Sequence, residues 1–171
     1  MNPVFLVAID PGAKGAIAWL SGGQYPNCMR LALGAVELSA QISALPIKAG
    51  MPKIAWLEEV SGFVGIPQPG SRMFAFGRSF GHVEAILIAA GFELHRIRPA
   101  AWQKFFSALS RRGEPKNAHK RRLAALAKEL FPILRDKITL QTADAVLILK
   151  YAEMKSNGAL PASKSERPAA S

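Results

Sequence analysis

The 171-residue chain has little cysteine, no long apolar run and few acidic residues. Its one cysteine, Cys28, excludes an intrachain disulfide and a zinc site built from several cysteines. No apolar stretch reaches the length that spans a bilayer. No basic segment precedes the apolar residues 4–9, which therefore predict a strand rather than a signal peptide. We expect a cytoplasmic protein with no membrane partner and no small-molecule cofactor.

The scarcity of acids leaves a strongly basic chain, with 22 Lys and Arg against 12 Asp and Glu and a net charge of +10. A polyanionic partner is expected, because neutralising phosphates drives nucleic-acid binding. Seven of the cations lie between residues 104 and 122, beside a single acid, Glu114. A charge run is usually a solvated helix face, but its position next to the acids described below favours phosphate contacts. The expected DNA contacts in this run are Lys104, Arg111, Arg112, Lys116, Lys120 and Arg121.

Apolar periodicity and turn residues predict a single α/β domain over residues 1–155 and a disordered polar tail over residues 156–171. Strands are expected at residues 4–10, 15–20, 24–30, 53–59 and 92–97. Helices are expected at residues 36–48 and 71–90, from Pro99, at residues 118–130 with Asn117 as the cap, and from Thr139 or Thr142 to Met154. This order indicates a mixed five-stranded sheet flanked by helices. The helix at residues 71–90 would bury Met73, Phe74, Phe76, Phe80, Val83, Ile86 and Leu87.

Three carboxylates stand next to apolar segments. Asp10 ends the first strand, Glu58 closes a later one, and Asp144 lies in the first turn of an apolar helix. An Asp-Pro-Gly turn and a helix dipole give Asp10 and Asp144 ordinary structural explanations. A buried charge is nevertheless costly unless it is paired or binds a metal. Three such acids on a basic chain predict a magnesium site that acts on a nucleic-acid phosphate.

The position of the middle acid is ambiguous, because Glu58 and Glu59 are adjacent. Successive side chains of a strand point to opposite faces, so only one of the two can share a site with Asp10. The alternation of apolar residues before them does not decide which.

The segments AIDPGAKGAIAWL, WLEEV, SRMFAFGRSFGHVEAILIAAGFELHRIRPAAWQKFF and TADAVLILKYAE resemble, in order and spacing, those of the RuvC-like Holliday junction resolvases. The resemblance covers residues 4–154. It implies a ribonuclease H-like fold and a homodimer that cuts four-way DNA junctions with Mg²⁺ or Mn²⁺ in recombination and repair. Asp10, Glu58 and Asp144 match the metal-binding acids of that family, with Asp10 bridging two ions, and this match selects Glu58 over Glu59.

One position departs from the family pattern. Many relatives have a fourth acidic or histidine ligand about one helical turn before the last acid, where this chain has Gln141. Gln141 brings a carbonyl oxygen without charge, and the nearest acid upstream is Asp136. The resemblance leaves three possibilities: Gln141 as an outer ligand, Asp136 reaching back, or one weakly bound metal.

Two further residues are expected near DNA. Phe63 lies in a Gly- and Pro-rich loop five residues after Glu58, where an aromatic ring either stacks on unpaired bases or packs under the loop. Arg78 lies in the long helix that the family uses near DNA. The broad apolar face of the same helix is either the dimer interface, as the resemblance implies, or part of the core.

Three other functions stay open. A nuclease of this fold that cuts structured RNA or other branched DNA needs the same acids. A junction-binding module that has lost catalysis is favoured by the uncharged Gln141. The turn at Gly12 and Gly15 also resembles the phosphate turn of actin-like ATPases and sugar kinases. Such an enzyme requires a second phosphate loop and a second domain, for which the chain is too short.

Overall fold

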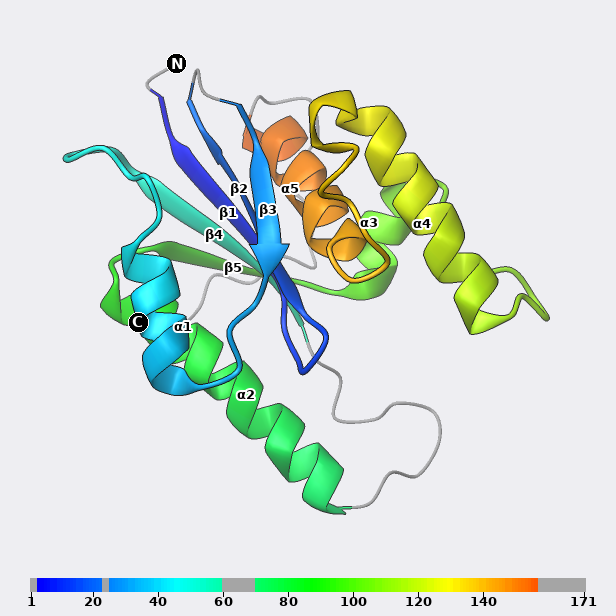
Figure 1. Ribbon diagram of the computed structural model, residues 1–171, viewed down its shortest axis with the longest axis horizontal. Helices are drawn as coiled ribbons and strands as arrows, with labels where there is room; N and C mark the ends of the chain where they lie inside the picture. Colours follow the sequence, from blue (N-terminus) through cyan, green and yellow to red (C-terminus); the bar gives the residue numbers. More distant parts are fainter. Residues whose placement is uncertain (1–2, 23–24, 60–69, 157–171) are drawn as a thin grey trace.

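The structure is a computed structural model that describes residues 3–22, 25–59 and 70–156 (Figure 1). The tail expected at residues 156–171 lies outside the described residues except for Ser156, which ends the last helix, and so does the loop with Phe63. The elements in chain order are β1 (Phe5–Asp10), β2 (Ala16–Ser21), β3 (Asn27–Arg30), α1 (Ala35–Ser43), β4 (Lys53–Glu58), α2 (Gly70–Ala89), β5 (Glu93–Ile97), α3 (Pro99–Phe105), α4 (Lys116–Leu130), a 3₁₀ turn (Pro132–Leu134) and α5 (Ala143–Ser156).

The strands form one mixed sheet in the order β3-β2-β1-β4-β5. β1, β2 and β3 are a meander of antiparallel neighbours, whereas β1, β4 and β5 run parallel. Parallel neighbours need a crossover connection, and α2 supplies the one between β4 and β5. The predicted mixed five-stranded sheet flanked by helices is confirmed.

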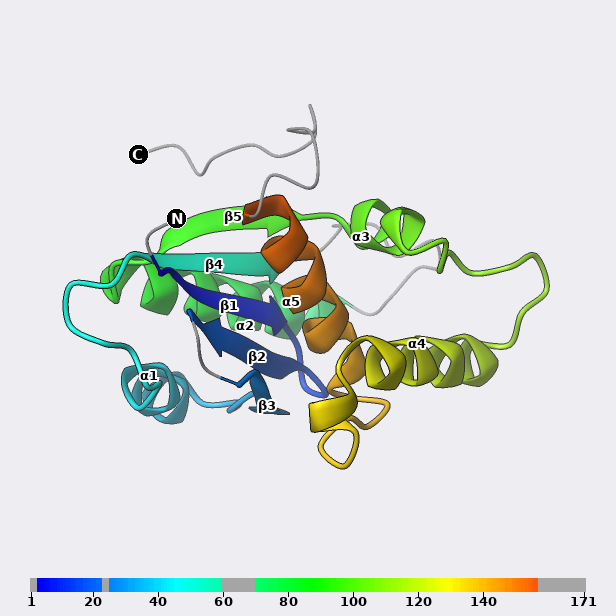
Figure 2. The same ribbon diagram turned by 90° about the horizontal axis from the view of Figure 1, so that it is seen from above.

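Helices cover both faces of the sheet (Figure 2). Side chains alternate along β1, so that Phe5, Val7 and Ile9 pack with α1 and α2 while Leu6 and Ala8 pack with α3, α4 and α5. Burial on both faces explains why the central strands are apolar throughout rather than alternating with polar residues.

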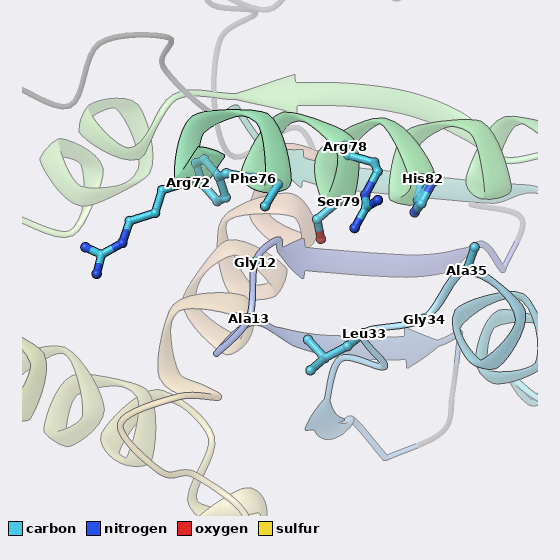
Figure 3. A pocket seen from close by; sticks show the side chains of 11 residues that line it. Gly12, Ala13, Leu33, Gly34, Ala35, Arg72, Phe76, Arg78, Ser79 and His82 are labelled. Atoms are coloured by element: carbon cyan, nitrogen blue, oxygen red, sulfur yellow. The ribbon is translucent and has the colours of Figure 1, made fainter. Parts of the chain in front are cut away.

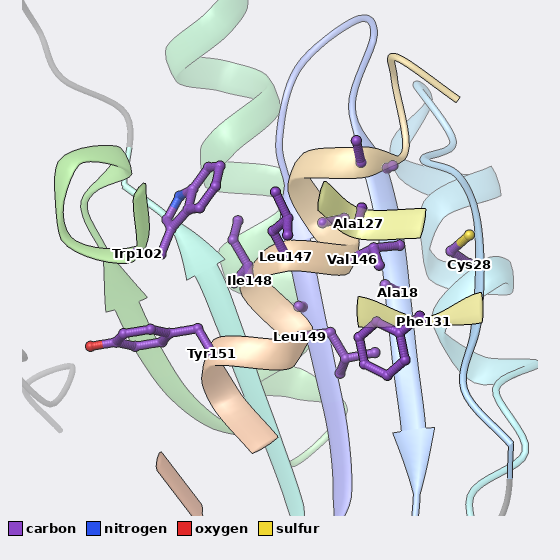
Figure 4. Packing of buried hydrophobic residues seen from close by; sticks show 14 of the residues in the cluster. Ala18, Cys28, Trp102, Ala127, Phe131, Val146, Leu147, Ile148, Leu149 and Tyr151 are labelled. Atoms are coloured by element: carbon purple, nitrogen blue, oxygen red, sulfur yellow. The ribbon is translucent and has the colours of Figure 1, made fainter. Parts of the chain in front are cut away.

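The last helix is buried over its first two turns, where every residue at positions 143–149 is less than a tenth exposed. It packs on Ala8, Ala16 and Ala18 of β1 and β2 (Figure 4). Alanine leaves little bulk on the sheet, so the large side chains of α5 fit against it at close-packed density. This contact places the N-terminal turn of α5 over the central strands.

One predicted helix start differs from the structure, and one agrees with it. α4 begins at Lys116 after Pro115, so Asn117 lies inside the helix rather than capping it. Before α5, the Thr139 hydroxyl accepts hydrogen bonds from the backbone N–H groups of Gln141 and Thr142, at 3.2 and 3.3 Å. Thr139 therefore caps the turn that leads into α5.

The apolar face predicted for α2 is too broad. Of the residues expected in this face, Val83 and Leu87 are buried, but Phe74 is 71% exposed. Ile88, which lies outside the predicted face, is 53% exposed. The sheet covers only one side of a helix, so a helix that is apolar on most of its surface keeps part of it in solvent. Within the described ranges, none of the helices combines the length and the apolarity needed to cross a membrane.

Candidate active site at the carboxyl ends of β1 and β4

Strand register brings the first two acids together. Ile9 of β1 pairs with Leu57 of the parallel strand β4, so the next residues, Asp10 and Glu58, lie side by side. Both follow the alternation that faces α5, because Ala8 and Trp56 two residues earlier pack with α5. The two carboxylates therefore share one face at the carboxyl edge of the sheet.

The neighbouring glutamate lies elsewhere. Glu59 accepts a hydrogen bond from Arg98 Nε at 3.2 Å, and both side chains are exposed. Its own N–H donates to the carbonyl of Ile97 at 2.7 Å, which extends the pairing of β4 with β5. The structure thus places Glu58, not Glu59, beside Asp10.

The third acid reaches the same place from α5. Asp144 lies in the first turn of α5, where the helix dipole favours a negative charge, and is only 6% exposed. Its Oδ2 accepts a hydrogen bond from Lys120 of α4. Its Oδ1 is buried and has no hydrogen-bond partner. A buried, unpartnered carboxylate oxygen is costly and is therefore a donor atom available to a cation.

The pKa values of the acids are shifted because the acids are buried and lie close to one another. Burial, followed by the charges of Glu58 and Asp144, raises the pKa of Asp10 to about 8. Burial also raises the pKa of Glu58 to about 7, against the lowering effect of a hydrogen bond from Trp102. Burial lowers the pKa of Lys120. The attraction of its ammonium to Asp144, Asp10 and Glu58 has the larger effect, so the pKa of Lys120 is raised overall. Carboxylates crowded in this way favour any added positive charge.

Trp102 is a site residue whose role the sequence did not predict beyond packing. Its ring is fully buried in the core between α3 and α5, and its Nε1–H donates to Glu58 Oε1 at 2.9 Å (Figure 4). A buried tryptophan N–H needs an acceptor, and this one holds the Glu58 carboxylate in a fixed orientation. The sequence shows only a tryptophan three residues after the proline that starts α3, and this does not reveal its acceptor.

The turn after Asp10 is held by backbone geometry and by Arg30. Gly12 has a φ of +119°, which L side chains rarely adopt. A Cβ on Gly15 would lie 2.2 Å from the carbonyl oxygen of Asp10. Arg30 of β3 donates to the carbonyls of Ala13 and Gly15, at 3.1 and 3.2 Å. The turn that follows Asp10 is therefore narrow and anchored to the neighbouring strand.

A pocket of about 460 Å³ opens next to Asp10. Three lysines contribute to its wall, and their positive charge attracts an anion to the pocket. Gln141 also lines it, whereas Asp136 is exposed and is not among its lining residues. Of the two candidates for the missing ligand, the structure brings only Gln141 to the pocket. The lining residues are Asp10, Pro11, Gly12, Ala13, Lys14, Gly15, Phe76, Lys116, Asn117, Lys120, Leu140 and Gln141.

Of the other predicted DNA contacts, the structure brings two to this pocket. Lys116 and Lys120 line it, while Lys104, Arg111, Arg112 and Arg121 are exposed on α3, on α4 and in the connection between them. Arg78 lines a second hollow of about 600 Å³ between α2 and the Gly12–Ala13 turn (Figure 3). The two hollows share Gly12, Ala13 and Phe76. Phe63 lies outside the described residues.

The donor set fits a divalent cation in its chemistry, because carboxylate and amide oxygens are the ligands that Mg²⁺ prefers. The free Asp144 Oδ1 supports this fit. Within the part of the chain that the structure describes, however, no three His, Cys, Asp or Glu side chains are arranged to hold one ion together. The positive charge that lies next to these acids in the structure is the ammonium of Lys120, which binds Asp144.

Comparison with known proteins gives the fold. No family model and no curated protein matches the sequence. Among solved structures, Thermus thermophilus RuvC in complex with Holliday junction substrate aligns with a TM-score of 0.58 and 14% identity, over 97% of this chain and 99% of that chain. A second structure of Thermus thermophilus RuvC aligns with a TM-score of 0.57 and 16% identity, over 97% and 100%. The chain therefore has the ribonuclease H-like fold of the RuvC Holliday junction resolvases.

Proposed function

We propose that this protein is a metal-dependent endonuclease that cuts four-way DNA junctions in recombination and repair. The observation that carries the proposal is the convergence of Asp10, Glu58 and Asp144 from three elements beneath a rim of lysines. Acids buried in this way favour a divalent cation, and the lysines favour a phosphate. The fold shared with a junction-bound RuvC supports a junction as the substrate.

In this proposal Asp10, Glu58 and Asp144 hold Mg²⁺ or Mn²⁺, with the Gln141 carbonyl oxygen at the edge of the same pocket. The bound cation would activate water and stabilise the leaving oxygen of the phosphodiester. Trp102 keeps the Glu58 carboxylate oriented toward Asp10. Lys120 balances the charge of Asp144, and Lys14 and Lys116 attract the DNA phosphate to the pocket. A rigid turn after Asp10 keeps its carboxylate in place while the strand is bound.

A homodimer is part of the proposal, because two identical sites suit a substrate with approximate two-fold symmetry. Its support is the exposed side of α2. Phe74 and Ile88 are largely exposed there, and a Cβ built on Gly77 or Gly81 would meet no atom within 4 Å. Glycines without neighbours let a second helix approach closely, and exposed apolar side chains favour such an approach.

Cleavage of a labelled four-way junction tests this function. The protein is incubated with the junction, with the matching duplex and with a structured RNA, in Mg²⁺, Mn²⁺ or EDTA. We expect paired nicks on the junction that need a divalent cation, and at least a 10²-fold loss of cleavage in Asp10→Asn with junction binding retained, since metal chemistry supplies several kcal/mol. Asp136→Asn is the matched control and should cut normally. Normal cutting by Asp10→Asn would contradict the site assignment.

A junction-binding module without catalysis is the second candidate. The observations that favour it are the uncharged Gln141 and the ammonium of Lys120 on Asp144, which together lower the negative charge available to a cation. The same assay separates the two, because such a module binds the junction in every buffer and produces no nicks. Cleavage of the RNA alone would instead indicate a different nuclease of this fold.

A further inference from the structure

The connection between α3 and α4 contains one partly buried acid among its cations. The Glu114 side chain is 11% exposed and accepts hydrogen bonds from Arg122 Nε at 3.1 Å, from Arg122 Nη2 at 3.0 Å and from the backbone N–H of Arg111 at 3.0 Å. His119 Nδ1 lies 3.3 Å from the same carboxylate. Arg122 holds the pKa of Glu114 down at about 2, so Glu114 is ionised at neutral pH.

These contacts close the connection, residues 106–115, onto α4. Arg122 Nη2 also donates to the carbonyl of Leu109 at 2.8 Å, so one guanidinium bonds to two points of the connection. The backbone turns sharply at Ser107 and Gly113, where φ is +52° and +76°, and the Glu114 N–H donates to the Arg111 carbonyl at 2.9 Å. The Arg122 guanidinium is therefore used in hydrogen bonds within the protein, although Arg122 belongs to the basic run at residues 104–122.

The remaining cations of this segment point to solvent. Arg111 and Arg112 are exposed in the connection, and Lys116 follows it at the start of α4. Lys116 lines the pocket that contains Asp10. The connection therefore ends one residue before the wall of the proposed active site, and its shape decides where its arginines lie relative to a bound strand.

We propose that Glu114 is a positioning residue, which acts through Arg122 and the Arg111 backbone to hold residues 106–115 in the shape that contacts DNA phosphates beside the cut. This inference rests on the proposed function. It predicts that replacing Glu114 changes the affinity for the junction in the direction opposite to the one expected from charge alone. Replacing an acid near DNA normally tightens binding, because one repulsion is removed. Removing the Glu114 anchor should instead weaken binding, since the DNA would have to order a backbone that the wild-type chain already holds.

The test compares Glu114→Gln with Glu129→Gln, which removes an exposed acid from α4, the helix that follows Glu114. Junction affinity is measured by fluorescence anisotropy from 50 to 200 mM KCl, in an Asp10→Asn background that does not cut. We expect Glu114→Gln to raise Kd about tenfold and to reduce the salt slope by about one, because fewer phosphates are contacted. Glu129→Gln should leave both values near wild type. In the cutting enzyme, Glu114→Gln should raise KM and leave kcat unchanged.

Hydrogen exchange of the free protein separates the positioning role from the proposed function. Backbone amides of residues 106–115 should exchange faster in Glu114→Gln and at the wild-type rate in Glu129→Gln. Unchanged exchange, or tighter junction binding by Glu114→Gln, would overturn the inference. A wild-type protein that neither binds nor cuts the junction would overturn the proposed function, and with it the DNA role of this connection, even if exchange showed that Glu114 orders it.

Discussion

At the scale of residues, the buried carboxylates oppose the stability of the metal-free fold. The pKa of Asp10 is raised from 3.8 to about 8, chiefly by burial, and that of Glu58 from 4.5 to about 7. A group with a raised pKa binds more protons in the folded than in the unfolded chain. The folded state therefore loses stability as the pH rises from about 4 to about 8. The same penalty makes the site receptive to a cation.

Asp10→Asn tests this balance through stability. In EDTA we expect the wild-type Tm to fall between pH 4 and 8 and the variant to melt higher than wild type at pH 8, by about 2–4 °C for each kcal/mol recovered in a chain of this size. The two proteins should melt at similar temperatures near pH 3, where the acid is mostly protonated in both states. Asp136→Asn, at an exposed position, is the control. A wild-type Tm that does not change with pH would contradict the prediction.

At the scale of elements, α5 connects core packing to the site. Its first turn carries Asp144, and the next two turns pack on Ala8, Ala16 and Ala18. The small size of these alanines decides how closely α5 approaches the sheet. A larger residue there would move the helix or force it into strained rotamers. The position of Asp144 relative to Asp10 therefore depends on side chains that never contact a substrate.

Ala18→Leu is expected to destabilise the protein by about 1–3 kcal/mol, the usual cost of overpacking a core. Junction cleavage should fall in the fraction that remains folded, because α5 is displaced. Urea unfolding and cleavage at constant folded concentration measure the two effects. Ala125→Leu, on an exposed position of α4, should change the unfolding free energy by less than about 0.5 kcal/mol. Full junction cleavage by folded Ala18→Leu would show that the position of α5 does not limit cleavage.

At the scale of the whole molecule, one side of α2 carries apolar side chains that stay exposed in the single chain. The sheet and α1 cover Val83 and Leu87, but Phe74 and Ile88 stay in solvent. Figure 1 shows α2 extending beyond the edge of the sheet where β3 ends, which is also the edge that carries Asp10. A dimer formed through α2 would place two sites on one assembly.

Ile88→Glu is expected to convert the proposed dimer to a monomer, because a charge at an apolar interface is left without solvent or partner. Light scattering coupled to size-exclusion chromatography measures the mass, and the junction assay shows whether paired nicks become single ones. Leu109→Glu alters a similarly exposed leucine in the connection before α4 and should leave the mass unchanged. A wild-type chain that elutes as a monomer would contradict the dimer.

Most of the fold was predictable because its signals are local. Apolar runs identified the five strands, and Pro99 identified a helix start that the structure confirms at the same residue. Errors occurred where neighbours outside the segment decide the outcome. Asn117 was expected to cap α4, but Pro115 starts the helix earlier. Phe74 was expected in the core, but the sheet covers only one side of α2.

The sequence by itself determined the order of elements and singled out Asp10, Asp144 and the adjacent pair Glu58 and Glu59, since periodicity and unusual acids are visible without coordinates. The family resemblance then favoured Glu58. Tertiary structure alone decided the surroundings of those acids. Strand register placed Glu58 rather than Glu59 beside Asp10, and helix packing brought Trp102 to Glu58 and Lys120 to Asp144. Such pairs join residues far apart in the chain, so their formation depends on how whole elements pack and not on any local pattern.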